Sequence, residues 1–189
     1  GTFDADSGPL IDFIGDLAFY IDALIDRSSL GIAFRPGIQK RRVKSNWKMP
    51  TENLIGDRMH GHHSHRSAFA QMSAERRERM DQIIADPEIA YQVAIDGGHG
   101  SICTYFPKLD THDLPLLPSD ASFYPPADLA QMQGLQSDVL ERLGKARTHT
   151  KPNSMAMFPN LTFLPFSLSI TVAHPRGPAE SELWTYLFY

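Results

Sequence analysis

Short runs of β-branched and aromatic residues, separated by turn residues, constrain the fold of this chain most. Residues 91–95 and 101–106 flank Gly97, Gly98, His99 and Gly100, a pattern typical of two strands joined by a turn. Two further runs, 161–172 and 181–189, lie on either side of the turn-forming segment 174–178, HPRGP. Residues 37–47 indicate a half-exposed strand. The sequence therefore predicts a β-sheet at the centre of the fold.

Helical patterns occupy the segments between these strands. Apolar residues three and four positions apart predict an amphipathic helix, or two short ones, over 8–27. Pro50 and Glu52 suit a first helical turn, so a helix is expected from about Thr51 into the histidines that follow. Further helices are predicted over 73–86, which is densely charged, and over 127–143, which ends at Gly144, with a Pro-rich loop over 107–126. The fold class is α+β, with helices packed on one side of the strands.

The size and charge of the chain exclude several classes of protein. Its 189 residues suffice for one globular domain with a core, and 18 basic against 22 acidic residues leave a net charge of −4. There is no basic stripe for a phosphate backbone and no apolar stretch near the roughly 20 residues that span a bilayer. We expect a cytoplasmic protein with no nucleic-acid or membrane partner. Both ends look severed, which suggests a fragment of a longer protein.

Cys103 is the single cysteine of the chain, and this restricts any metal site. One cysteine can form neither an intrachain disulfide nor a cysteine-based zinc or iron–sulfur site. Any metal here must be held by histidine and carboxylate.

Four of the eight histidines lie within six positions, at 60, 62, 63 and 65, shortly after Asp57. Neutral imidazole is the commonest protein ligand of first-row metals, and two imidazoles with one carboxylate make a non-haem iron(II) site with open positions for O₂. The other interpretation is a surface turn rich in histidine, with incidental metal affinity.

The spacing of these histidines leaves the ligand pair open. Residues five apart lie about 140° apart around a regular helix, so His60 and His65 share a metal only if the helix breaks or widens as in a π-turn. Gly61 makes such a distortion cheap. The pairs His60/His63 and His62/His65 would face one way without distortion.

The run 46–65, NWKMPTENLIGDRMHGHHSH, resembles the mononuclear-iron motif in the large (α) subunit of Rieske ring-hydroxylating dioxygenases. The similarity continues through 1–4, 15–26, 98–100, 158–159, 163–165, 174–178 and 182–184, and is closest to the biphenyl, toluene and naphthalene branch. The resemblance implies that residues 1–189 form part of a helix-grip (START-like) catalytic domain with an antiparallel sheet. The Rieske domain and the C-terminal part of the catalytic domain would be absent.

The resemblance also implies roles for individual residues. His60 and His65 match the two histidine ligands of the iron, whose third, carboxylate ligand would lie outside the chain, while His62 and His63 fall on variable positions. Asp57 matches the carboxylate that bridges an iron ligand to a Rieske-cluster histidine of the neighbouring subunit, as the electron-transfer route. A carboxylate that accepts a ligand's ring N–H would also fix its tautomer.

Further residues match positions near the iron and the substrate. Asn53 matches a residue that lines the iron site, and Leu54 a pocket position beside it. Arg58 occupies a position that is commonly apolar or small: pointing inward it would favour an anionic or polar aromatic substrate, and pointing outward it would be a surface charge. The remaining candidate substrate contacts are Gly61, Ser154 (where close relatives often have histidine), Leu164 and Phe166. His99 is either a pocket residue or a satisfied turn histidine.

The implied function is that of a terminal oxygenase component that cis-dihydroxylates an aromatic ring with O₂. It would need mononuclear Fe(II), a Rieske [2Fe-2S] cluster in the missing domain, and NADH-derived electrons from a reductase, with or without a ferredoxin. A trimer, with or without β subunits, is expected, and the fragment alone should be inactive. The alternatives are a non-redox helix-grip ligand-binding module, a zinc-dependent hydrolase that uses His60, His65 and Asp57, or a monooxygenase or demethylase of the same superfamily.

Overall fold

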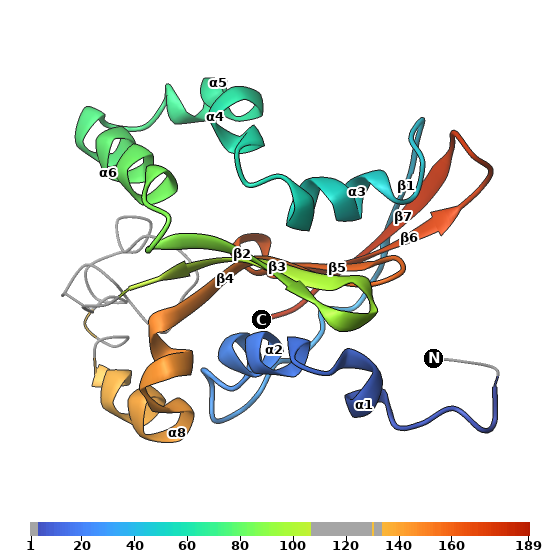
Figure 1. Cartoon of the computed structure of the whole chain (residues 1–189), viewed down its shortest axis with the longest axis horizontal. Coiled ribbons are helices and arrows are strands. Elements are labelled where there is room, and N and C mark those ends of the chain that lie inside the picture. The colour runs from blue at the N-terminus through green and yellow to red at the C-terminus, as the bar shows by residue number, and fades with distance from the viewer. Residues whose placement is uncertain (1–3, 107–129, 131–133) are drawn as a thin grey trace.

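A seven-stranded antiparallel sheet forms the centre of the fold (Figure 1). The structure is a computed structural model that describes residues 4–106, 130 and 134–189. The strand order is β1-β7-β6-β5-β4-β3-β2. The strands are β1 (Gln39–Val43), β2 (Ala90–Ile95), β3 (His99–Tyr105), β4 (Thr150–Met157), β5 (Leu161–Leu164), β6 (Ser169–Pro175) and β7 (Ser181–Leu187).

The predicted strands around the glycine-rich turn are confirmed as β2 and β3, which pair from Ala90 opposite Thr104 to Ile95 opposite His99. The strand predicted over 161–172 is instead two strands, β5 and β6, separated by the 3₁₀ turn η4 (Pro165–Ser167). The expected strand over 37–47 is confirmed in part, since β1 occupies five of its residues, Gln39–Val43. Strand β4 was not predicted.

On one side of the sheet lie α1 (Leu10–Ile14), α2 (Leu17–Ile25) and α8 (Gln136–His149) (Figure 1). Gly15, with φ of +48°, separates α1 from α2, so the segment 8–27 forms two short helices rather than one. Helix α8 does not end at Gly144 as predicted but kinks there and continues to His149. The expected loop over 107–126 and the first residues of the helix predicted over 127–143 lie outside the described residues.

A second set of helices lies on the opposite side of the sheet (Figure 1). It comprises α3 (Met49–Thr51), the π-helix η1 (Glu52–Gly56), α4 (His60–Ser64), α5 (Arg66–Phe69) and α6 (Ala74–Ala85). The prediction of a continuous helix from Thr51 into the histidines is wrong, because Asp57 has non-helical backbone angles, φ −132° and ψ 89°, and separates η1 from α4. The α+β class with an antiparallel sheet is confirmed. The helices lie on both sides of the sheet (Figure 1), whereas the sequence predicted them on one side.

The hydrophobic core lies between α2 and the sheet. Its buried members are Ile14, Leu17, Leu24, Met155, Phe163 and Phe188. Beside it, the buried Arg27 guanidinium donates hydrogen bonds to the carbonyls of Ala23 (2.5 Å), Arg147 (3.1 Å) and Thr150 (2.6 Å). Burial lowers the pKa of Arg27 to about 10. One side chain therefore joins α2 to the end of α8 and the start of β4.

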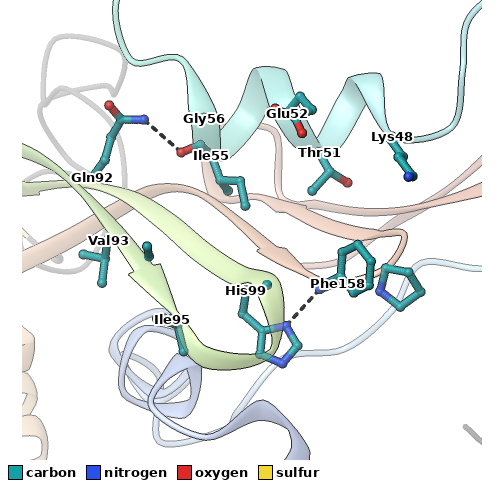
Figure 2. Close-up of a pocket in the computed structure, with 13 residues that line it drawn as sticks. Lys48, Thr51, Glu52, Ile55, Gly56, Gln92, Val93, Ile95, His99 and Phe158 are labelled. Atoms are coloured by element: carbon teal, nitrogen blue, oxygen red, sulfur yellow. Dashed lines mark hydrogen bonds between the residues drawn. The ribbon is translucent and has the colours of Figure 1, made fainter.

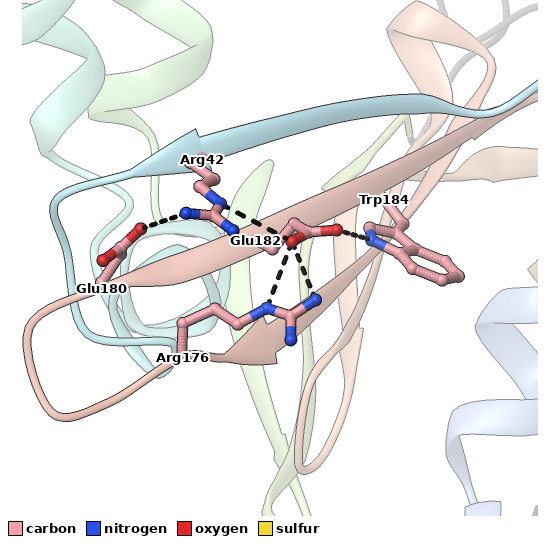
Figure 3. Close-up of polar contacts among 5 residues, drawn as sticks. All are labelled: Arg42, Arg176, Glu180, Glu182 and Trp184. Atoms are coloured by element: carbon pink, nitrogen blue, oxygen red, sulfur yellow. Dashed lines mark hydrogen bonds and ion pairs between the residues drawn. The ribbon is translucent and has the colours of Figure 1, made fainter.

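The hairpin of β6 and β7 is braced by a polar cluster around Glu182 (Figure 3). One carboxylate oxygen accepts from Arg176 Nε (3.1 Å) and Nη2 (2.8 Å), and the other accepts from Trp184 Nε1 (2.6 Å). The indole N–H of Trp184 and the guanidinium of Arg176 lower the pKa of Glu182. Arg42 on β1 lies 3.7 Å from Glu180 and 3.9 Å from Glu182, so the cluster also ties the edge strand to the hairpin.

The same hairpin holds the segment that enters the helical layer. Asn46 Nδ2 donates to the Pro178 carbonyl (2.8 Å), and the Ser181 hydroxyl donates to the Ser45 carbonyl (2.7 Å). Two stretches that carry the sequence resemblance, 46–48 and 174–178, therefore meet in the fold. Among the described residues, every helix is too short or too polar to cross a membrane.

Candidate functional site

The π-helix η1 is held from below by two side chains of the sheet. Carbonyls in the last turn of a helix lack partners within the helix and need donors from elsewhere. The Ser154 hydroxyl of β4 donates to the Leu54 carbonyl, and Gln92 Nε2 of β2 donates to the Ile55 carbonyl (2.9 Å). These two hydrogen bonds tie the last turn of η1 to the sheet, directly before Asp57.

Asp57 closes the turn that leads into the histidines. Its Oδ1 accepts hydrogen bonds from the backbone N–H groups of Met59 (3.0 Å) and His60 (2.9 Å). Such a carboxylate satisfies the unpaired donors at a helix start and adds favourable charge there. Asp57 is itself exposed, so one oxygen shapes the loop while the side chain stays accessible.

His60 and His65 converge, with their Nε2 atoms 3.3 Å apart and their ring planes tilted by 58°. The helix α4 ends at Ser64, and His65 leaves helical geometry at φ −101° and ψ 10°. This break brings together two rings that a straight helix would turn apart. A side chain at Gly61 would meet nothing within 4 Å, so space alone does not require glycine there.

A hydrogen bond assigns the tautomer of His60. Its Nδ1 lies 2.5 Å from the Asp57 carbonyl, and because a carbonyl can only accept, Nδ1 carries the proton. The lone pair of Nε2 then faces His65. This is the arrangement typical of a metal-ligating histidine, whose other ring nitrogen donates to a backbone carbonyl or carboxylate.

The two Nε2 atoms fit a shared metal ion. Two nitrogen ligands, each about 2.1 Å from one ion, lie roughly 3.0–3.4 Å apart for angles between a right angle and the tetrahedral one. The observed 3.3 Å falls in this range. Among the described residues no three His, Cys, Asp or Glu side chains gather into a metal-binding group. The pair therefore supplies two ligands, and its role in binding iron stays a prediction.

The other predicted site residues occupy three places. Asn53 and Leu54 lie on η1, where Asn53 is exposed, and Arg58, in the loop after Asp57, is half-buried. Ser154 is buried on β4, and its hydroxyl contacts the backbone of Leu54. A third group lies on β5 and η4: Leu164 is half-buried, and Phe166 is 67% exposed. Leu54 and Ser154 are thus brought together, and the contacts of these residues with a substrate stay predictions.

A pocket of about 590 Å³ opens between the helical layer and strands β2 and β3 (Figure 2). Most of its lining was not predicted, since the sequence does not show which face of α3 and η1 turns toward the sheet. The lining residues are Lys48, Thr51, Glu52, Ile55, Gly56, Gln92, Val93, Ala94, Ile95, Gly98, His99, Phe158 and Pro159.

His99 combines its two predicted interpretations, because it lines the pocket and is also hydrogen-bonded on both ring nitrogens. Its Nδ1 accepts from the backbone N–H of Phe158 (2.9 Å), and its Nε2–H donates to the Phe13 carbonyl (2.8 Å). The ring is therefore neutral and buried, and it connects α1 to the turns at 97–98 and 158–159. Both polar atoms are occupied, so His99 offers the pocket an apolar ring face.

Comparison with known proteins identifies relatives of this chain. The model of the ring hydroxylating alpha subunit (catalytic domain) family matches residues 19–189. The chain is 31% identical to the benzene 1,2-dioxygenase subunit alpha of Pseudomonas putida, covering 98% of this chain and 40% of the relative. It is 30% identical to the biphenyl 2,3-dioxygenase subunit alpha of Rhodococcus jostii, covering 98% of this chain and 39% of that one.

The fold also matches solved structures. A naphthalene 1,2-dioxygenase with indole bound in its active site superposes with a TM-score of 0.78 at 24% identity, over 100% of this chain and 41% of the other. At that identity the match shows the fold alone. The chain spans about 40% of the length of the curated relatives it matches.

Proposed function

We propose, because the chain belongs to the ring-hydroxylating α-subunit (catalytic domain) family, that it is part of a terminal oxygenase. The whole protein would cis-dihydroxylate an aromatic ring, using O₂ and electrons that originate from NADH. The names of the relatives, benzene and biphenyl dioxygenase subunits, support an aromatic hydrocarbon as substrate. The observation that carries the proposal is the convergence of the His60 and His65 rings, 3.3 Å apart at Nε2.

In this proposal His60 and His65 hold a mononuclear iron(II), and a carboxylate from outside this chain completes the site. Iron(II) in a two-histidine, one-carboxylate site supplies the open positions at which non-haem oxygenases bind and activate O₂. The chain's own part is to keep His60 in one tautomer. The Asp57 carbonyl accepts a hydrogen bond from Nδ1–H, so Nε2 carries the lone pair that a metal ion would bind.

Asp57 is proposed to pass electrons from a Rieske [2Fe-2S] cluster on a neighbouring subunit. Its carboxylate is exposed, as a contact to another subunit requires, and it accepts a hydrogen bond from the His60 backbone N–H. This role requires an oligomer, for which we propose a trimer, with or without β subunits. A reductase, with or without a ferredoxin, would supply electrons to the cluster. A cytoplasmic location stays part of the proposal.

The remaining predicted residues are proposed to line the iron and substrate sites. Asn53, Leu54, Arg58 and Gly61 belong to the segment that carries Asp57 and the histidines. Ser154 lies beneath it, and Leu164 and Phe166 would contact the substrate from β5 and η4. Residues 1–189 would then be a partial catalytic domain, and this chain alone, without a third iron ligand or a Rieske cluster, should not turn over.

The test is product analysis on the whole protein with its reductase, supplied with benzene, biphenyl or naphthalene under ¹⁸O₂. We expect cis-diols in which both oxygens are labelled, and we expect the double variant His60→Ala, His65→Ala to form none. One labelled oxygen per product would instead indicate a monooxygenase. Retention of zinc with no preference for iron, together with no diol product, would contradict the proposal in favour of a zinc-dependent hydrolase.

A further inference from the structure

Strand β1 forms one end of the sheet and leaves its outer edge open (Figure 1). Within the part of the chain that the structure describes, β1 pairs only with β7, and no other residue forms a backbone hydrogen bond with it. Every second residue of an edge strand points its N–H and C=O groups outward, where another strand can pair with them. Gln39–Val43 therefore presents a row of unused donors and acceptors.

The open edge is fixed at both ends. Before β1, the Arg35 N–H donates to the Leu187 carbonyl (2.8 Å). After β1, the Ser45 carbonyl accepts from the Ser181 hydroxyl (2.7 Å). A segment that is ordered in advance loses little conformational entropy when a partner binds to it. The edge is thus prepared for pairing with a further strand.

The edge carries a concentration of positive charge. Six of the 18 Lys and Arg residues lie within residues 35–48, which contain no Asp or Glu, although the whole chain has a net charge of −4. On β1 itself, residues 40–42 are all cationic and exposed, and the exposed Lys44 directly follows the strand. This edge therefore attracts negatively charged groups.

The arrangement of these charges favours a protein segment over a phosphate backbone. Lys40 and Arg42 lie on one face of the sheet and Arg41 on the other, because side chains alternate along a strand that is paired as β1 is with β7. Nucleic acids are bound by basic side chains gathered on one face. A phosphate surface also offers no donors for the outward carbonyls, whereas an extended peptide pairs with both kinds of backbone group.

Two of the cations have no partner of opposite charge. Arg42 is already engaged by two glutamates of the hairpin (Figure 3). In contrast, neither Arg41 nor Lys44 forms an ion pair with any described residue. An acidic segment would gain ion pairs there without breaking existing ones. Because exposed ion pairs contribute little free energy, main-chain hydrogen bonds would supply most of the affinity and the charges would select the partner.

A second copy of this chain does not fit the same edge. Pairing β1 with β1 of another copy would place cations opposite or beside cations, which destabilises a strand pair. Charged residues on edge strands ordinarily prevent such self-association. The same charges stabilise pairing with a strand of opposite charge, so they distinguish an acidic partner from a copy of this chain.

We propose that β1 is a docking edge for an extended acidic segment of a partner protein, which adds to the sheet as a further strand. The backbone groups of the partner pair with the outer edge of β1, and its Asp or Glu side chains face Arg41 and Lys44. None of the residues proposed to hold iron or substrate lies on this edge. The proposal is therefore independent of the proposed oxygenase function.

The test uses the whole protein and a labelled, capped peptide of about eight residues, a usual strand length, in which glutamate alternates with threonine. Fluorescence anisotropy at low ionic strength measures the dissociation constants. We expect this peptide to bind at least about tenfold more tightly than the same peptide with lysine in place of glutamate. Methylation of every backbone nitrogen keeps the charges but removes the donors, and it should weaken binding at least about tenfold. Bound peptide should also slow hydrogen exchange over Gln39–Val43.

Charge reversal locates the site. The double variant Arg41→Glu, Lys44→Glu should bind the glutamate peptide at least about tenfold more weakly than the wild type does, and the lysine peptide more tightly. Arg77→Glu, Lys145→Glu is the matched control, because it makes the same changes at exposed positions on α6 and α8. Its affinities should stay within about twofold of those of the wild type.

Several results would overturn the proposal. These are no binding of the glutamate peptide, equal binding of its methylated form, or an equal loss of affinity in the two double variants. Tighter binding of a single-stranded oligonucleotide or of phosphatidylglycerol vesicles than of the glutamate peptide would replace the proposed partner with a phosphate-bearing one. None of these measurements depends on iron or turnover, so failure here is distinguishable from failure of the proposed oxygenase function.

Discussion

The Nε2 atoms of His60 and His65 lie 3.3 Å apart because α4 ends between them, at Ser64. If this pair binds the metal, His60→Ala and His65→Ala should each lower the affinity for Co²⁺ by at least about tenfold, since each removes one of two ligands. Calorimetric titration measures the change. His63→Ala is the matched control and should bind as the wild type does, because His63 lies on the same helix but is not one of the two converging rings. An equal loss in all three variants would show that the cluster binds metal without a defined pair.

Asp57 has a structural role that can be separated from its charge. Asp57→Asn keeps an oxygen that can accept from the Met59 and His60 N–H groups, whereas Asp57→Ala removes the acceptor. We expect Asp57→Ala to weaken Co²⁺ binding several-fold and to destabilise the turn by about 0.5–2 kcal/mol, the range for losing a helix cap. Asp57→Asn should bind metal within about twofold of the wild type. In the whole enzyme it should slow reduction of the iron site in rapid-mixing experiments, and an unchanged rate would contradict the proposed electron route.

Ser154 should act on the metal site through the backbone of η1. Ser154→Ala removes the buried hydroxyl that donates to the carbonyl of the half-buried Leu54, and we expect a loss of about 1–3 kcal/mol in the free energy of unfolding. Because η1 leads directly to Asp57, Co²⁺ binding should also weaken. Ser167→Ala, which removes an exposed hydroxyl bonded to the Leu164 carbonyl, is the matched control and should change neither quantity. Urea denaturation and metal titration measure the two effects, and stability loss with unchanged metal affinity would separate Ser154 from the site.

Glu182 should make stability depend on pH in the acidic range. The Trp184 indole and Arg176 lower its pKa below the ordinary value of 4.5, so the folded protein holds the carboxylate ionised where the unfolded chain takes up a proton. The stabilisation is therefore present above about pH 4.5 and is lost as the pH falls through the folded-state pKa. Glu182→Gln should flatten this step in urea titrations between about pH 6 and 3. Glu180→Gln, whose ion pair with Arg42 is more exposed, should retain it.

Cys103 should be inert toward thiol reagents in the folded protein. It is fully buried, and burial raises its pKa from 9.0 to about 12. At pH 8 the thiolate fraction is then about a thousandfold lower than in the unfolded chain. Labelling with a chromogenic disulfide should therefore appear only as urea unfolds the protein, and rapid labelling without urea would contradict the burial. Because the folded state keeps its proton longer, stability should also fall as the pH rises between about 9 and 12, and Cys103→Ala should reduce that slope.

The strands were predictable where local chemistry and sheet pairing agree. The turn around Gly97 and Gly98, both at positive φ, needs glycine, and the runs beside it alternate as paired strands do. Strand β4 was missed because it contains Pro152, which cannot donate to a ladder. The structure places Pro152 opposite Cys103, where the register shifts, so a bulge accommodates it. The division between β5 and β6 depends on Leu168 at φ +47°, a conformation that its residue type does not indicate.

The candidate site was predictable as a motif but not as a geometry. The spacing of the histidines left three ligand pairs open, and a family resemblance was needed to choose His60 and His65 among them. No local pattern showed that the helix ends before Asp57. The last turn of η1 is bonded to Ser154 and Gln92, which lie 100 and 37 residues along the chain from the residues whose carbonyls they contact.

The guanidinium of Arg27 reaches carbonyls 120 and 123 residues further along the chain, and the whole stretch from β1 to α8 lies between these points. Because closing a longer loop costs only slightly more entropy than closing a shorter one, residues could be inserted or deleted in the loops that join these elements without separating the two ends that Arg27 connects. These loops could then vary in length and sequence during evolution, while the hydrogen bonds of Arg27 to Arg147 and Thr150 keep the two ends of the stretch together.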